Sequence, residues 1–148
     1  MAQHLFVYGT LMSGAGHRMG ARLQREARLV GLARIKGRLY DLGAYPALVE
    51  TGPADGDVHG EVFELIDPSR SLRWLDAYEG IVPGREAHSE YARVERTVRL
   101  EDGRELTAWV YIYRAPVHGR PIIESGRWLS RPRFQSIHRR GGVQSQPS

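Results

Sequence analysis

One carboxylate in this sequence stands where helix electrostatics would suit proton transfer. Glu79 closes the apolar-faced run at residues 75–79 and is followed by Gly80, a residue type that commonly ends helices. The negative end of a helix dipole disfavours a carboxylate, which raises the pKa of that group. A carboxyl group of this kind can accept a proton and return it, so Glu79 is a candidate general acid/base. An exposed glutamate at a frayed helix end explains the same pattern, and this feature alone favours that simpler interpretation.

A second segment has the pattern of an anion-binding loop. At residues 7–11 (VYGTL) an apolar run typical of a buried strand ends in Gly9 and Thr10. Backbone N–H groups released at a strand end can converge on an anion such as a carboxylate, and glycine allows close approach. We therefore expect Tyr8, Gly9, Thr10 and Leu11 to line the polar end of the main pocket. A simple chain turn at Gly9 is an equally good explanation of the residues alone.

Several other kinds of chemistry have no support in the sequence. It contains no phosphate-binding loop of the GxxxxGK type, no dinucleotide-binding fingerprint and no GxSxG nucleophile turn. It also contains no cysteine, which excludes thiol catalysis and thiolate metal sites. The six histidines are scattered and no two stand four residues apart, so no metal site is predicted.

The candidate residues are spread over strands and two helices. A carboxylate at Asp67 and a proline at position 68 predict a helix start, and Gly80 predicts its end. A second helix is expected at about 17–27. Strands are expected at 4–8, 29–42 (one bent strand or two short ones), 47–50, 58–66, 91–100 and 106–113, with a last strand or helix turn within 122–129. Because βαβ alternation is absent, we predict an α+β fold with a curled, mostly antiparallel sheet or small barrel.

Composition and charge indicate one globular domain with a basic end. Of the 148 residues, 41% are hydrophobic and 26% charged, and no apolar run approaches the roughly 20 residues that cross a bilayer. We expect no membrane association and, given the lack of cysteine, a cytoplasmic location. The net charge is +4, yet residues 127–148 hold five arginines and no acidic residue. We therefore expect a domain over 1–130 and a basic, disordered tail over 131–148.

An ordered set of short blocks carries a family resemblance from about residue 4 to residue 129. The blocks are 6–11 (FVYGTL), 37–41 (GRLYD) with Tyr45 and Pro46, 59–63 (HGEVF), 75–80 (LDAYEG), 91–93 (YAR) and 108–111 (AWVY). Together they resemble the γ-glutamylcyclotransferase-like family, which includes AIG2-like proteins and γ-glutamylamine cyclotransferases. The resemblance implies a small mixed β-barrel flanked by short helices, with a pocket at one end of the barrel.

The resemblance also implies a reaction and a site. Family enzymes convert a γ-glutamyl amine or γ-glutamyl amino acid to 5-oxoproline and a free amine, without a metal or other cofactor. In this sequence the family's catalytic glutamate falls on Glu79, and its substrate-binding loop falls on Tyr8, Gly9, Thr10 and Leu11. A pocket tyrosine falls on Tyr91. Tyr113 and Arg38 are further pocket candidates outside the matched motifs.

Three classes of function follow from these observations. The first is a cyclotransferase whose partner is a small γ-glutamyl substrate. The second is a noncatalytic small-molecule binding module of the same fold, although a mere binder of the glutamyl carboxylate would gain nothing from a second anion at Glu79. The third is weak contact with RNA through the arginines of the tail, and it is the least supported because residues 1–126 carry a net charge of −1.

Overall fold

Six strands and two helices form the part of the chain that the computed structural model describes, residues 2–53 and 55–130. The predicted basic tail, residues 131–148, lies outside the described residues. Short 3-10 turns occur at Ser13–Ala15, Glu86–His88 and Trp128–Ser130. The main elements are β1 (His4–Val7), α1 (Arg18–Glu26), β2 (Ala27–Asp41), β3 (Pro46–Val49), β4 (Gly56–Leu65), α2 (Pro68–Tyr78), β5 (Tyr91–Leu100) and β6 (Glu105–Tyr113).

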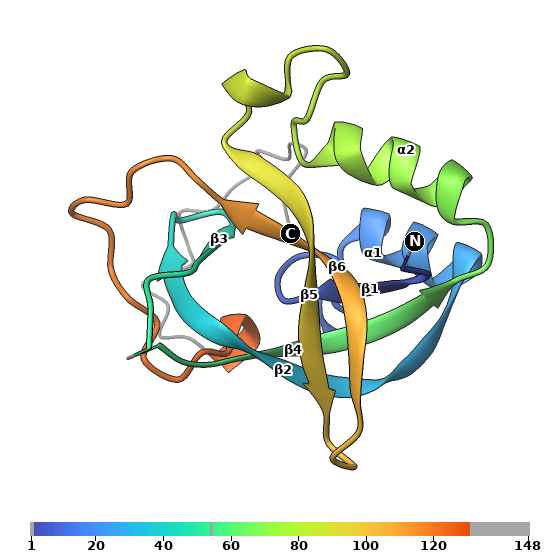
Figure 1. Ribbon diagram of the computed structural model, residues 1–148, viewed down its shortest axis with the longest axis horizontal. Coiled ribbons are helices and arrows are strands. Elements are labelled where there is room, and N and C mark those ends of the chain that lie inside the picture. Colours follow the sequence, from blue (N-terminus) through green and yellow to red (C-terminus); the bar gives the residue numbers. More distant parts are fainter. Residues whose placement is uncertain (1, 54, 131–148) are drawn as a thin grey trace.

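The strands close into a small barrel (Figure 1). Their order is β3-β2-β4-β1-β6-β5, and β2 also pairs with β5 through Ala33 opposite Leu100, which closes a ring of five strands. The pairing of β1 with β6 is parallel and the other pairings are antiparallel. β3 extends β2 outside the ring. The predicted α+β fold, a mixed and mostly antiparallel barrel with two flanking helices, is confirmed.

β2 is one long, bent strand rather than two short ones. Its register with β4 shifts between Leu29 and Gly31, which is the bulge that glycine in this run predicts. Further along, a Cβ at Gly37 would lie 2.6 Å from Cδ1 of Leu48, so glycine allows β3 to approach closely. Because Ala27 already pairs with Leu65 of β4, α1 ends at Glu26, one residue earlier than the sequence pattern predicts.

Both ends of α2 follow from local chemistry. The Asp67 carboxylate accepts a hydrogen bond from the Arg70 backbone N–H at 3.3 Å, and Pro68 begins the helix. At the other end, the Ile81 N–H donates to the Asp76 carbonyl at 2.8 Å and the Gly80 N–H donates to the Ala77 carbonyl at 3.0 Å. These two hydrogen bonds, together with the positive φ of 82° at Gly80, form a Schellman motif. Glu79 is therefore the C-cap residue of α2.

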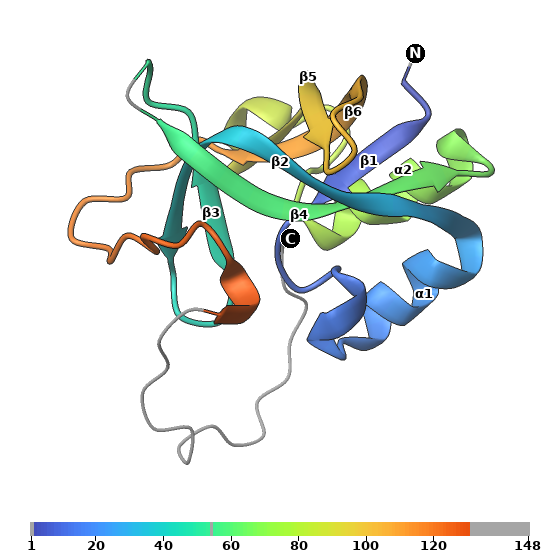
Figure 2. The ribbon, with the colours of Figure 1, turned by 90° about the horizontal axis from the view of Figure 1, so that it is seen from below.

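The helices and the C-terminal turn lie on different sides of the barrel. Both α1 and α2 lie near β1, whereas β3 and the turn Trp128–Ser130 lie at the other side (Figure 2). In the predicted last strand or helix turn, Ile122 makes a single bridge to Tyr40 and the 3-10 turn follows. Neither helix of residues 2–53 and 55–130 has the length and apolar character of a membrane span.

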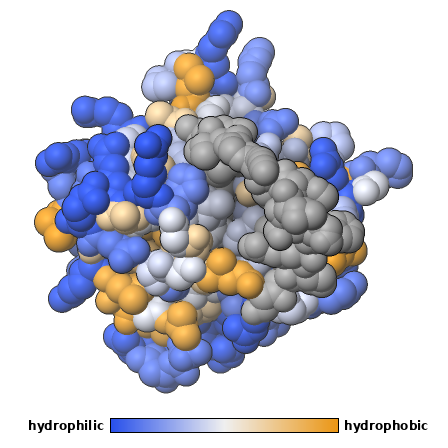
Figure 3. Space-filling model, turned by 180° about the vertical axis from the view of Figure 1, so that it is seen from behind, coloured by the Kyte–Doolittle hydropathy of each residue, from blue (hydrophilic) through white to orange (hydrophobic). Residues whose placement is uncertain are grey.

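Large aromatic side chains are buried in two clusters: Tyr8 belongs to one, whereas Tyr91 and Tyr111 belong to the other, which also contains Leu72 and Leu75 of α2. Tyr8 and Tyr111 are fully buried and Tyr91 is only 2% exposed. Larger exposed apolar residues are dispersed, and on the face opposite Figure 1 small apolar patches alternate with hydrophilic residues (Figure 3). A buried tyrosine needs a hydrogen-bond partner for its hydroxyl, so these side chains also fix where polar atoms lie in the core.

Candidate active site

The loop predicted to bind an anion leaves the sheet at the end of β1. The paired register between β1 and β4 ends with Val7 opposite Glu61, so residues 8–11 lie beyond it. The Met12 N–H donates to the Gly9 carbonyl at 3.0 Å, which closes a turn. The loop packs tightly against α1, because a Cβ at Gly20 of that helix would lie only 3.1 Å from the Leu11 carbonyl oxygen. The Tyr8 and Leu11 side chains are fully buried.

Glu79 lies beside this loop although it is distant in sequence. Its side chain is only 3% exposed and its Oε1 atom is buried, so the exposed, frayed alternative is wrong. The preceding residue, Tyr78, places its hydroxyl 2.8 Å from Oγ1 of Thr10, and these two residues are 68 positions apart. The end of α2 and the loop after β1 therefore meet in the folded chain.

Three buried tyrosines lie within electrostatic range of the Glu79 carboxylate. Burial and then the charge of Glu79 raise the pKa of Tyr8 well above its usual value. Burial, Tyr8 and Glu79 raise the pKa of Tyr91, and burial, Asp76 and Glu79 raise the pKa of Tyr111. These phenols therefore stay protonated at neutral pH and act as neutral hydrogen-bond donors around the acid.

Hydrogen bonds from the hydroxyl groups fix the positions of Tyr8 and Tyr91. The Tyr8 hydroxyl donates to the Tyr111 carbonyl at 2.6 Å, and the Tyr91 hydroxyl donates to the Pro46 carbonyl at 2.6 Å. The ring of Tyr113, a further pocket candidate, packs edge-on against Tyr91 with centroids 5.0 Å apart. Tyr8, Tyr91 and Tyr113 thus form an aromatic wall, which hydrogen bonds to the backbone of β6 and β3 hold in place.

A polar network anchors the helix end that carries Glu79. Asp76, one turn earlier on α2, accepts bonds from Arg93 Nε at 2.8 Å and Nη2 at 3.1 Å, and from the Tyr111 hydroxyl at 2.7 Å. The Arg93 guanidinium also lies 4.3 Å above the Trp109 ring. A bidentate arginine–carboxylate pair has a defined geometry, so this network fixes α2 on β5 and β6.

The structure brings most of the predicted site residues together. Tyr8, Thr10, Glu79 and Tyr91 share one region, whereas the guanidinium of Arg38 interacts with Asp55 in the loop before β4. Sequence reasoning assigned no role to Asp76, Tyr78 or Tyr111, although the three-residue spacing of Asp76 and Glu79 places them on one helix face. Among residues 2–53 and 55–130, no group of three or more His, Asp or Glu side chains could hold a metal ion.

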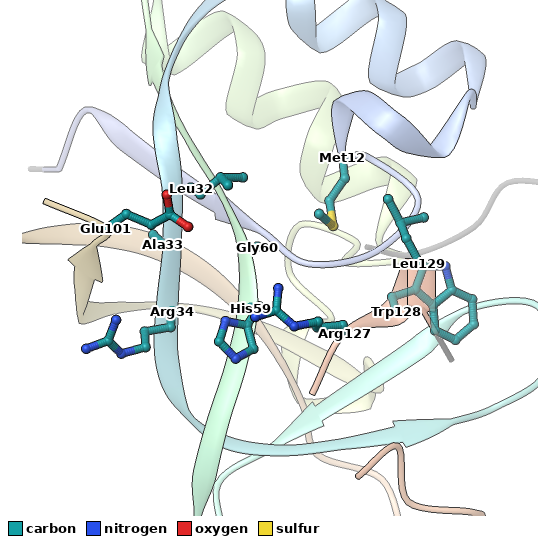
Figure 4. Close-up of a pocket in the computed structure, with 10 residues that line it drawn as sticks. All are labelled: Met12, Leu32, Ala33, Arg34, His59, Gly60, Glu101, Arg127, Trp128 and Leu129. Carbon is teal, nitrogen blue, oxygen red and sulfur yellow. The ribbon is translucent and has the colours of Figure 1, made fainter. Parts of the chain in front are cut away.

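A cavity of about 390 Å³ lies apart from these residues, between β2, β4 and residues 127–129 (Figure 4). None of the predicted site residues lines it. Its wall includes Met12, just past the predicted loop, together with His59, Arg127 and Trp128. Glu79 itself is buried, as are Tyr8, Leu11 and Tyr91.

Comparison with known proteins agrees with this arrangement. A model of the family described as gamma-glutamyl cyclotransferase, AIG2-like, matches residues 5–130. The chain belongs to this family. The matched range contains every residue of the loop, the end of α2 and the aromatic wall.

Individual members of the gamma-glutamyl cyclotransferase, AIG2-like family are similar over most of their length. The gamma-glutamylcyclotransferase family protein YtfP of Escherichia coli strain K12 is 38% identical over 128 residues, which cover 86% of this chain and 96% of the relative. The corresponding protein of Citrobacter rodentium is 37% identical over 131 residues, covering 88% and 98%. The crystal structure of an AIG2-like protein from Mus musculus covers 89% of this chain and 85% of that one, with a TM-score of 0.60 and 23% identity, and shows the shared fold.

Proposed function

We propose that this protein converts a γ-glutamyl amine or γ-glutamyl amino acid to 5-oxoproline and a free amine. The observation that carries the proposal is the buried Glu79 carboxylate, placed next to the loop after β1 and within electrostatic range of Tyr8, Tyr91 and Tyr111. Membership of the gamma-glutamyl cyclotransferase family supports the same reaction class.

Glu79 has the role of general acid/base in this proposal. It removes a proton from the α-ammonium group of the substrate, and the resulting amine attacks the γ-carbonyl carbon. A C–N bond forms within the glutamyl unit, and the bond to the leaving nitrogen then breaks. Glu79 gives this proton to the leaving nitrogen as that bond breaks, and the ring nitrogen passes its own surplus proton to the released amine, which departs as an ammonium ion. No water is consumed, and one carboxylate takes up and returns the first proton. Because nucleophile and electrophile belong to one molecule, holding it in a folded pose supplies much of the rate enhancement.

Residues 8–11 bind the α-carboxylate or the developing oxyanion in this proposal. The loop lies past the last β1–β4 pair, and backbone N–H groups of such a segment can point toward an anion. Gly9 has no side chain to keep the ligand away from those groups. Tyr91, fixed by its bond to the Pro46 carbonyl, forms a wall of the substrate site.

The alternative function is a noncatalytic module that binds a small molecule without converting it. A carboxylate beside the substrate's α-ammonium group would strengthen simple binding as well as accept a proton, so turnover is what separates the two functions.

A direct assay tests the proposal. The purified protein is incubated with a panel of γ-glutamyl amines and γ-glutamyl peptides, including glutathione, and both 5-oxoproline and the free amine are measured. We expect equal amounts of the two products from at least one compound. Calorimetric binding of a γ-glutamyl compound without conversion of any member of the panel would favour the binding module and overturn the proposed reaction.

A further inference from the structure

An acidic residue occupies a core position of β4. Side chains at alternate positions of a strand share a face, so Glu61 projects from the same face as Phe63 and Leu65. Those two residues are buried in the hydrophobic core, and Glu61 itself is only 6% exposed. A carboxylate at a buried position is costly unless its oxygens receive hydrogen bonds, so its partners indicate its purpose.

Both oxygens of Glu61 bind one residue. The Ser13 backbone N–H donates to Oε1 at 2.7 Å, and the Ser13 hydroxyl donates to Oε2 at 2.6 Å. These are the short distances of charge-assisted hydrogen bonds. Ser13 begins the 3-10 turn that directly follows the loop after β1, so the carboxylate holds the far end of that loop.

The near end of the loop is fixed at the same place. β1 leaves the sheet at Val7, whose partner in the β1–β4 register is Glu61. The chain then turns through residues 8–12 and returns to the Glu61 side chain at Ser13. The neighbouring Gly60 keeps this junction tight, because a Cβ there would lie 2.1 Å from the Val7 carbonyl oxygen. One residue of β4 therefore fixes both ends of a five-residue loop.

We propose that Glu61 is a positioning residue that clamps the loop at residues 8–12 through Ser13 and so preorganises its N–H groups for an anionic substrate group. Holding these donors in place before the ligand arrives removes the entropy cost of ordering them during binding. Glu61 itself touches no reacting atom in this proposal. Its relevance to substrate rests on the proposed function, whereas its effect on loop order does not.

The first experiment measures loop order without any substrate. Backbone ¹⁵N relaxation gives order parameters for Gly9, Thr10 and Leu11 in the wild type, Glu61→Gln and Ser13→Ala. Glutamine keeps the size of the side chain but loses the charge and one acceptor oxygen. We expect order parameters to fall from about 0.85 to below about 0.6 in Glu61→Gln, with a smaller fall in Ser13→Ala, which keeps the backbone bond.

A matched control removes an equal charge from the same strand. Glu64 lies three residues further along β4 and pairs with Arg28, away from the loop, so Glu64→Gln should leave the order parameters unchanged. A folded Glu61→Gln variant with an unchanged loop would overturn the proposal. If Glu61→Gln fails to fold, Ser13→Ala decides: a fall in its order parameters supports the clamp and wild-type values contradict it.

The second experiment is kinetic. With a substrate from the γ-glutamyl panel, we expect Glu61→Gln to raise KM about tenfold with kcat nearly unchanged, because binding rather than chemistry depends on loop order. A fall in kcat with an unchanged KM would contradict a positioning role. If the wild-type protein converts no substrate, the proposed function fails, and the order parameters alone then decide whether Glu61 is a clamp.

Discussion

The hydroxyl groups of Thr10 and Tyr78 lie 2.8 Å apart and join two segments that are distant in sequence. Thr10 belongs to the loop after β1, and Tyr78 is the last residue of α2, directly before Glu79. This bond therefore sets the separation between the proposed carboxylate-binding loop and the proposed general acid/base. Cyclisation depends on that separation, because the α-ammonium group must reach Glu79 while the α-carboxylate is held by the loop.

Removing either hydroxyl should weaken the junction between the loop and the helix. We expect Tyr78→Phe and Thr10→Val each to lower the free energy of unfolding by about 1 kcal/mol, the usual contribution of one hydrogen bond. Because the two groups share a bond, the double variant should lose less than the sum of the single losses. Urea unfolding of all four proteins measures this coupling, and strictly additive losses would show that the bond contributes nothing.

Glutamine at position 79 should remove turnover and leave the fold intact. Glu79→Gln keeps the shape and hydrogen-bonding capacity of the side chain but can no longer accept a proton. We expect 5-oxoproline release to fall by about 10²–10⁴-fold, the range of general acid–base catalysis, with a thermal midpoint close to that of the wild type. Glu86→Gln, which changes an exposed glutamate of the next loop, is the control and should keep full activity. Full activity of Glu79→Gln would remove this residue from the mechanism.

The order of elements could be predicted because its signals are local. Asp67 and Pro68 start α2, Gly80 ends it, and the glycine at position 31 accompanies the bulge in β2. The closure of the barrel has no local signal, because the pairing of Ala33 with Leu100 joins strands that are far apart in the chain. The strand pattern alone is compatible with either a curled sheet or a closed barrel, and the family resemblance is what indicates the barrel.

The sequence indicates which residues make up the candidate site, but it does not indicate how deeply they are buried. A glutamate at a helix end is usually exposed, and only packing against distant strands buries Glu79 among Tyr8, Tyr91 and Tyr111. The sequence pattern predicts no role for Glu61, because its partner Ser13 lies 48 residues away. Functions that depend on such long-range contacts become visible only in the folded chain.

The buried tyrosines should make the protein sensitive to alkali. Their pKa values are raised in the folded state, by burial first and then by nearby carboxylates, whereas the same groups ionise near pH 10 when unfolded. Their contribution to stability is therefore fully present below about pH 10 and is lost as pH rises above it. Each such tyrosine should lower the free energy of unfolding by about 1.4 kcal/mol per pH unit in that range.

The effect can be measured cleanly because Lys36 is the single lysine of the sequence. Urea unfolding at several pH values from about 9 to about 11 gives the slope of stability against pH. Tyr8→Phe loses the bond to the Tyr111 carbonyl, which lowers stability at every pH, but it should also make the alkaline slope shallower. A slope equal to that of the wild type would show that Tyr8 ionises as readily in the folded chain as in the unfolded chain.

The Asp76–Arg93 pair should stabilise the fold more than an exposed pair of similar geometry. Both side chains are about one quarter exposed, and Asp76 also accepts the Tyr111 hydroxyl, so Asp76→Asn leaves a partly buried guanidinium without its counter-charge. We expect a loss of about 2 kcal/mol in unfolding free energy. Asp102→Asn is the matched control, because its pair with Arg104 is more than half exposed and screened by solvent, so its loss should be clearly smaller. Since the Asp76 network also holds the helix end that bears Glu79, Asp76→Asn should lower kcat while the protein remains folded. Equal, small losses in the two variants, with unchanged turnover, would show that the network neither stabilises α2 nor positions Glu79.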